Sequence, residues 1–259
     1  MTFYQRTRRL WMVGDSFARG YALGNLADLI APTHPMYGFS SIWRMQNLVF
    51  EENGVNIRGD TYLIGSISQA NLASDLATFF ASSDVGDRDM VVFEDAGQHN
   101  SSPNLYRSQY EGVLSAVKAA RLTLDLRVCT TPDNSPAVGT DYQWDVSFLG
   151  QGTMNQAAQA AAAAQGVLVI DMNTIITAYW GSVLAADGVV LPQPDNIHMR
   201  VWDQMKWAGT VLASFGLTPS IKTRTSLTQI ASDNWSQLGY GSGSWSQAKA
   251  VDYCAAILG

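Results

Sequence analysis

The chain has 259 residues, enough for one large domain with a substantial buried core, and its formal net charge is −6. The main cluster of positive charge is Arg6, Arg8 and Arg9, too little to hold a phosphate backbone, so we expect no nucleic-acid partner. No apolar run approaches the ~20 residues that cross a bilayer. The first residues also lack the pattern of a signal peptide, so the sequence predicts a soluble chain without a membrane span or a leader.

The composition adds two expectations. Charged residues are 15% of the chain, against about 25% in ordinary soluble domains, which favours an extracellular or virion-associated setting over the ordinary cytoplasm. Cys129 and Cys254 stand among apolar neighbours, so they are expected to be two inert core thiols. Three histidines without a ligand-spaced Cys or His pair predict no metal site, and we expect no cofactor.

Strand-like and helix-like patterns alternate along the chain. Buried-strand patterns are expected at 9–13, 55–57, 62–64, 89–93, 124–129 and 167–170, and helical patterns at 41–51, 69–80, 105–120, 154–165 and 199–215. Such alternation predicts an α/β fold in which helices cover both faces of a parallel sheet. Functional groups should then gather at the carboxyl ends of the strands.

The pattern changes after residue 216, which predicts a main domain at 1–216 and an extension at 217–259. Ser, Thr, Gly and Asn dominate the extension, and Trp-Ser-Gln occurs twice, at 235–237 and 245–247. One interpretation is a hairpin or helical cap packed on the main domain. The other is an element for homo-oligomerisation or docking.

The first chemical motif is Gly14-Asp15-Ser16-Phe17, directly after the first expected strand. Ser16 would emerge at the sheet edge near a helix N-terminus, where free N–H groups favour negative charge, so it is a candidate nucleophile. Asp and Ser after a strand are also ordinary helix N-caps. Three residues alone do not decide between these roles.

The second motif is Asp195-Asn196-Ile197-His198, before the last expected helix of the main domain. Its spacing lets the Asp195 carboxylate accept a hydrogen bond from Nδ1 of His198 and direct Nε2 outward as a base. A hydroxyl nucleophile needs such a base, and the base is usually oriented by a third group. The conjunction of both motifs therefore favours a catalytic role for each.

These two motifs resemble the first and last blocks of the SGNH, or GDSL, family of esterases and lipases, over about residues 10–216. The resemblance implies a three-layer α/β/α sandwich with a parallel, flavodoxin-like central sheet. It also implies Ser16 as nucleophile, His198 as base and Asp195 as its partner.

The same resemblance implies two further oxyanion donors. One is a backbone amide after the second strand, for which Gly65 is chosen, although Ser66 fits as well. The other is an Asn side chain in a Gly-x-Asn-Asp block, where this chain reads Gly97-Gln98-His99-Asn100. Strict alignment selects His99, and a shift of one position selects Asn100. Asn100 is slightly favoured, because an amide donates without dependence on protonation.

Two adjacent acids, Glu94 and Asp95, end the expected strand at 89–93 and raise the alternative of a glycosidase. Neighbours along a strand point to opposite sides, so we expect one hydrogen-bonded and one solvated acid without a shared catalytic role.

The predicted activity is a serine ester hydrolase, most simply an O-acetyl esterase acting on glycans. Trp144, Trp180 and Trp202 are candidate substrate-binding residues, because aromatic rings pack on sugar faces, although such tryptophans are slightly more often core anchors. The alternatives are a short-chain lipase or thioesterase of the same fold and a glycan-binding or structural module without turnover.

Overall fold

We describe the protein from a computed structural model. The structure describes residues 8–14, 61–63, 67–95, 97, 100–132, 149–179, 201–217, 221–233, 235–238 and 245–258. The chain forms two compact units, each made of three segments. Unit 1 is Met1–Asp15, Phe50–Thr131 and Trp144–Asp171, and unit 2 is Ser16–Val49, Pro132–Gln143 and Met172–Gly259.

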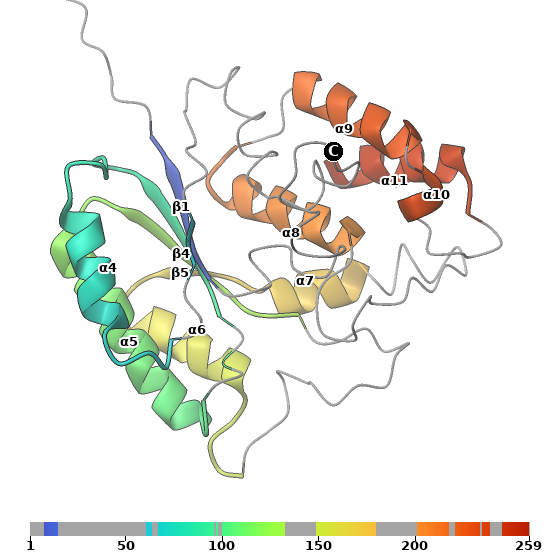
Figure 1. Ribbon diagram of the computed structural model, residues 1–259. Coiled ribbons are helices and arrows are strands. Elements are labelled where there is room, and N and C mark those ends of the chain that lie inside the picture. Colours follow the sequence, from blue (N-terminus) through green and yellow to red (C-terminus); the bar gives the residue numbers. More distant parts are fainter. Residues whose placement is uncertain are drawn as a thin grey trace, which may run out of the picture. The chain divides into compact units, whose positions relative to one another are not determined.

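Unit 1 contains a five-stranded parallel sheet (Figure 1). Its strands are β1 (Leu10–Gly14), β2 (Thr61–Leu63), β3 (Met90–Glu94), β4 (Asp125–Cys129) and β5 (Leu168–Ile170). They lie in the order β2-β1-β3-β4-β5, which is the flavodoxin-like order. In chain order, β2 lies on one side of β1, and β3, β4 and β5 lie on the other, so the topological switch point lies between β1 and β3. In open sheets of this kind, ligands bind beyond the carboxyl ends of the strands at that point.

Three helices of unit 1 cover one face of this sheet, and they are α4 (Leu72–Ala81), α5 (Pro103–Ala120) and α6 (Met154–Ala164) (Figure 1). Alternate strand residues such as Trp11, Val13 and Phe93 point into the core beneath them. Residues of opposite parity, such as Met12 and Val92, are buried as well. Burial on both faces is typical of parallel strands and explains their nearly continuous apolar runs.

Local sequence signals set the helix starts. Ser102 caps α5 by accepting from the amide of Leu105, and proline occupies the first helical position. Thr153 and Gln156 form a reciprocal capping box at α6.

The amino-terminal end of the sheet is held by the buried carboxylate of Asp89. It accepts from the amides of Arg9 (2.9 Å) and Gly86 (2.8 Å) and from Nε1 of Trp11 (2.8 Å). Asp89 stands just before β3, and Arg9 just before β1, so one side chain joins the starts of two neighbouring strands. A Cβ on Gly86 would come within 2.9 Å of Asp89 Oδ1, which explains the glycine there.

Unit 2 is described as helices. They are α7 (Met172–Tyr179), α8 (Val201–Ser214), α9 (Ile221–Asp233), α10 (Trp235–Leu238) and α11 (Gln247–Leu258). Helix α11 packs against α9 and α8, and α7 packs against α8. The ring of Trp245 stacks on that of Tyr253, with centroids 5.5 Å apart. The region after residue 216 is thus helical in the described segments.

The predicted α/β class and the flavodoxin-like parallel sheet are confirmed, and each described strand and helix of unit 1 lies within a few residues of its expected position. The expected helix at 41–51 and strand at 55–57 lie outside the described residues. Helix α7 was not expected. No helix in the described segments is long and apolar enough to cross a membrane.

Candidate active site

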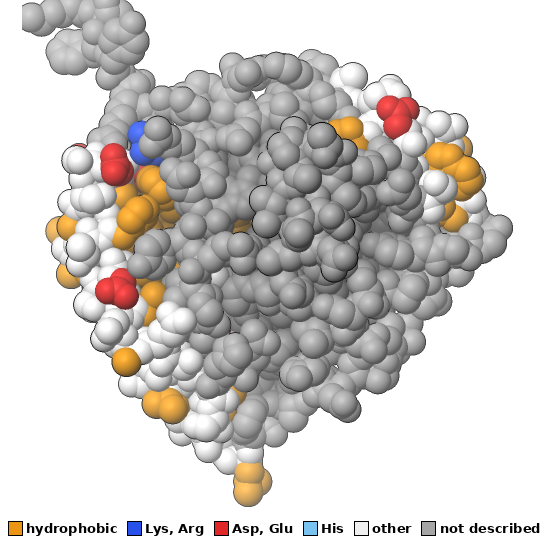
Figure 2. All heavy atoms as spheres, viewed as in Figure 1, with side chains coloured by type: hydrophobic (Ala, Val, Ile, Leu, Met, Phe, Trp, Pro, Cys, Tyr) orange, Lys and Arg blue, Asp and Glu red, His pale blue; other side chains and the backbone are white. Residues whose placement is uncertain are grey.

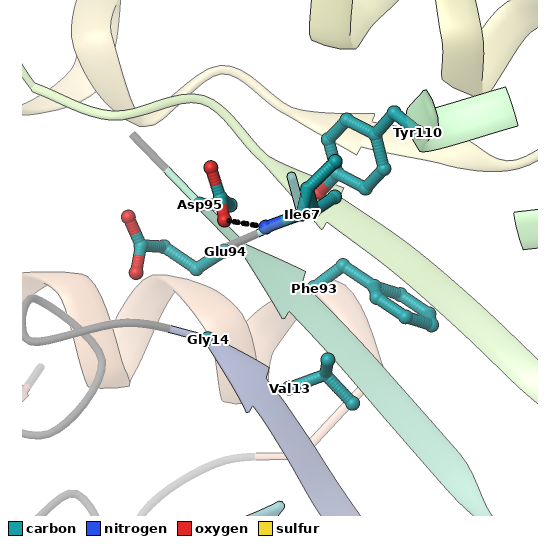
Figure 3. Close-up of a pocket in the computed structure, with 7 residues that line it drawn as sticks. All are labelled: Val13, Gly14, Ile67, Phe93, Glu94, Asp95 and Tyr110. Carbon is teal, nitrogen blue, oxygen red and sulfur yellow. Dashed lines mark hydrogen bonds between the residues drawn. The ribbon is translucent and has the colours of Figure 1, made fainter. Parts of the chain in front are cut away.

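The switch point of the sheet carries a small pocket (Figure 3). Its lining residues come from the carboxyl ends of β1 and β3, the segment after β2, and α5: Val13, Gly14, Ile67, Phe93, Glu94, Asp95 and Tyr110. Gly14 is paired in register with Glu94, and it is followed in sequence by Asp15 and Ser16. The pocket therefore marks the sheet edge from which the Gly-Asp-Ser motif continues.

The two adjacent acids at this edge point in different directions, as expected for neighbours along a strand (Figure 3). The expectation that one of them is solvated is wrong, since Glu94 is 1% exposed and Asp95 is 9% exposed. Glu94 accepts from the hydroxyl of Thr131 at 3.1 Å. The side-chain amide of Asn155, in α6, in turn accepts from the amide of Thr131 and donates to its carbonyl, each at 2.9 Å.

Asp95 connects two loops. Its Oδ2 accepts from the amide of Ile67 at 2.7 Å (Figure 3), and its Oδ1 accepts from the amide of Gly97 at 2.7 Å. The backbone carbonyl of Asp95 accepts from the hydroxyl of Tyr106, in α5, at 2.5 Å. The carboxylate thus joins the loop after β2 to the loop after β3.

A tight turn follows Asp95. Gly97 has a φ of +71°, and a Cβ there would come within 3.3 Å of Met154 and of the Tyr106 ring, so both backbone and packing favour glycine. The amide of Asn100 donates to the carbonyl of Gly97 at 2.9 Å and closes the turn. Both polar atoms of the Asn100 side chain are buried, and neither has a hydrogen-bond partner among the described residues. Of these two atoms, the Nδ2 donor is the one that an anionic oxygen would satisfy, since an oxyanion cannot donate to the Oδ1 acceptor.

Comparisons with known proteins place this fold. No model of a protein family matches the sequence, and no curated protein matches it. Among solved structures, a putative GDSL-like lipase from Parabacteroides merdae ATCC 43184 superposes with a TM-score of 0.55 and 12% identity, over 82% of this chain and 96% of that one. A member of the lipolytic protein G-D-S-L family from Veillonella parvula DSM 2008 has a TM-score of 0.50 and 15% identity, over 81% and 99%.

The chain has the fold of the GDSL lipolytic proteins. The resemblance suggested by the Gly14–Ser16 and Asp195–His198 motifs is confirmed at this level. Both superpositions cover nearly all of the GDSL protein, so the likeness is not confined to one strand-helix unit.

Most side chains expected to do chemistry lie outside the described residues. They are Ser16, Gly65, His99, Asp195 and His198, together with Trp144 and Trp180. Trp202 is the second residue of α8, and its side chain is not among those described. Their roles stay predictions on the GDSL fold. Asn100 is the described member of the expected set.

The sequence reasoning missed part of the polar network. Thr130 and Thr131 directly follow β4, and polar residues after a buried strand are a usable signal for the functional edge of a sheet. Thr130 donates to Asp171, the residue after β5, at 3.0 Å. No sequence signal pairs Asn155 with Thr131, because their contact depends on how α6 packs.

The two thiols are free and buried, as expected. Burial, and then the charge of Glu94, raises the pKa of Cys129 well above its ordinary value. Burial raises the pKa of Cys254 to about 11, against the opposing effect of the Thr228 hydroxyl. Both are poor nucleophiles, since the thiolate is the reactive form. The described residues contain no group of three or more His, Cys, Asp or Glu that could hold a metal ion.

Proposed function

We propose that the chain is a serine ester hydrolase that forms an acyl-enzyme on Ser16. In the sequence, Ser16 comes two residues after the end of β1, and β1 borders the switch point where sheets of this order bind ligands. The fold is that of the GDSL lipolytic proteins. The observation that carries the proposal is the buried side-chain amide of Asn100. Its Nδ2 donor has no partner among the described residues and lies in the loop after β3, so it is available to donate a hydrogen bond to an oxyanion.

In the proposed reaction, His198 removes the proton from Ser16 as the hydroxyl oxygen attacks the ester carbonyl, while Asp195 accepts a hydrogen bond from Nδ1. The carbonyl oxygen becomes an oxyanion, which accepts from the amides of Ser16 and Gly65 and from the side chain of Asn100. The protonated imidazole then gives its proton to the leaving alcohol. A water molecule, deprotonated by the same imidazole, then attacks the acyl-enzyme. The bond between the acyl carbon and the Ser16 oxygen breaks, the acid is released, and the imidazolium returns its proton to Ser16.

A fluorophosphonate probe tests the nucleophile directly. We expect the wild-type chain to be labelled and Ser16→Ala to remain unlabelled. Ser101→Ala is the matched control, because Ser101 is an exposed serine in the loop after β3, and it should label like the wild type. Failure of the folded wild type to label contradicts the proposal and supports a glycan-binding or structural module instead.

For the substrate, we propose O-acetyl esters of glycans. The low charged fraction of 15% and the positions of Trp144, Trp180 and Trp202 near the expected catalytic segments support this class. A series of 4-nitrophenyl esters from acetate to octanoate distinguishes it from a lipase or thioesterase. We expect kcat/KM to be highest for acetate, and a steady increase toward octanoate contradicts the acetyl preference.

A further inference from the structure

We propose that Asp95 is a positioning residue that holds the two donor loops of the oxyanion hole in register with each other. The inference rests on the proposed serine hydrolase function and adds to it a residue with no direct role in bond breaking. Asp95 Oδ2 binds the amide of Ile67, two residues after Gly65, and Oδ1 binds the amide of Gly97, which begins the turn to Asn100. Each carboxylate oxygen thus holds one of the two loops.

The sheet itself cannot hold these loops together. The order is β2-β1-β3, so β2 and β3 are not hydrogen-bonded to each other, and β1 lies between them and pairs with both. Neighbouring strands lie about 4.8 Å apart, so the ends of β2 and β3 are separated by about twice that distance. The Asp95 carboxylate bridges the loops that follow them, past the end of the strand that leads to Ser16.

The bridge is largely buried and is tied to the core. Asp95 is 9% exposed, and hydrogen bonds to a carboxylate are strong in such surroundings. Its carbonyl is held by the hydroxyl of Tyr106, whose ring also packs against Gly97. Tyr106 is 1% exposed and belongs to α5, so the bridge is fixed to the core. A donor held this way needs little rearrangement when charge develops on the substrate.

The test is Asp95→Asn compared with Asp89→Asn, a matched control in the same chain. Each substitution keeps the shape of a buried side chain that accepts from two backbone amides, and Asp89 also accepts from Nε1 of Trp11. Each substitution replaces one acceptor oxygen by an NH2 group that faces an N–H donor. Asp89 lies at the opposite end of β3. Turnover of 4-nitrophenyl acetate and the thermal midpoint are measured for both.

We expect both variants to lose a comparable amount of thermal stability. Asp95→Asn should lower kcat by roughly tenfold to a hundredfold with little change in KM, because misplacing a donor by about 1 Å has that effect. Asp89→Asn should keep a kcat within about twofold of the wild type. Equal kcat values for the two variants overturn the inference and make Asp95 a structural residue only.

A double variant and a milder substitution complete the test. If Asp95 acts through the donor loops, the double variant with Asp95→Asn and Asn100→Ala should lose less kcat than the product of the fold-losses of the two single variants. If Asp95→Asn does not fold, Tyr106→Phe decides, because it removes only the hydroxyl that holds the Asp95 carbonyl. We expect its kcat to fall several-fold, and an unchanged kcat overturns the inference.

The wild type separates this inference from the proposed function. Labelling of Ser16 and turnover by the wild type test the hydrolase assignment before any variant is compared. An inactive, unlabelled wild type contradicts the proposed function. An active wild type with an unaffected Asp95→Asn contradicts the positioning role alone.

Discussion

Two hypotheses for the side-chain oxyanion donor differ in the residue that they select, His99 or Asn100. Strict spacing after Gly97 selects His99, and a shift of one position selects Asn100. The structure describes Asn100, whose amide closes the turn and whose side-chain polar atoms are buried, while His99 lies outside the described residues. An amide N–H also donates at every pH at which the base is active, whereas imidazole must present one tautomer.

We therefore predict that Asn100→Ala lowers kcat by roughly a hundredfold to a thousandfold, the usual effect of removing one oxyanion donor. His99→Ala should leave kcat nearly unchanged. Steady-state hydrolysis of 4-nitrophenyl acetate measures both, and Asn104→Ala, at an exposed asparagine of α5, serves as the control. The reverse ranking of Asn100 and His99 selects the strict alignment, and no effect of either refutes the assigned donor.

Side-chain partners were the part of the site that the sequence could not predict. Asp95 and Ile67 are 28 positions apart, and their contact depends on the order of strands across the sheet. The sequence did place both acids at the correct strand end. It could not assign a bridging role to Asp95, because an acid after a strand is equally compatible with a solvated surface.

Among strands, β1 and β3 depend on a shared clamp at their starts. Asp89→Ala would leave the amides of Arg9 and Gly86 and the indole N–H of Trp11 without their acceptor in a buried setting. We predict a loss of about 3 kcal/mol in the free energy of unfolding, because each unsatisfied buried group costs about 1–3 kcal/mol and part of the cost relaxes. Urea denaturation measures it, and a loss below about 1 kcal/mol contradicts the clamp.

Strands and long helices were predictable because their patterns are strong. Strands buried on both faces are continuous apolar runs, and α5 and α6 carry N-terminal caps in the sequence. The sequence pattern did not predict helices α9 and α11 individually. In α9, Ser and Thr have modest helix propensity. The stability of both helices comes from packing, in which Leu227, Ala231 and Cys254 are buried, and packing is not visible in a local pattern. The domain boundary after residue 216 stays a prediction.

The two units are interleaved along the chain, which has a consequence for cooperativity. Each unit is built from three separate segments, so the ends of every internal segment are tied to the other unit. Loss of one unit releases the anchored ends of the other. We therefore predict that both units unfold together, and each contains one buried thiol, Cys129 or Cys254, that can report it.

Single-thiol variants measure this. In Cys129→Ala and Cys254→Ala, the remaining thiol should react with a disulfide reagent at pH 8 only after denaturation, because burial raises the pKa of both thiols and keeps them protonated. In each variant, the urea midpoint of thiol exposure should coincide with the urea midpoint that circular dichroism gives for the same variant. Exposure of one thiol well before global unfolding contradicts a single cooperative transition.

The sheet register also has a consequence for synthesis on the ribosome. Leu10 pairs with Met90, and Gly14 with Glu94, so β1 is made about 80 residues before the strand that flanks it on one side. At about 5–20 residues per second, the nascent chain carries this apolar segment for roughly 4–16 seconds before β3 is translated. Helper proteins that bind exposed nascent segments should therefore associate with residues 10–14 during translation.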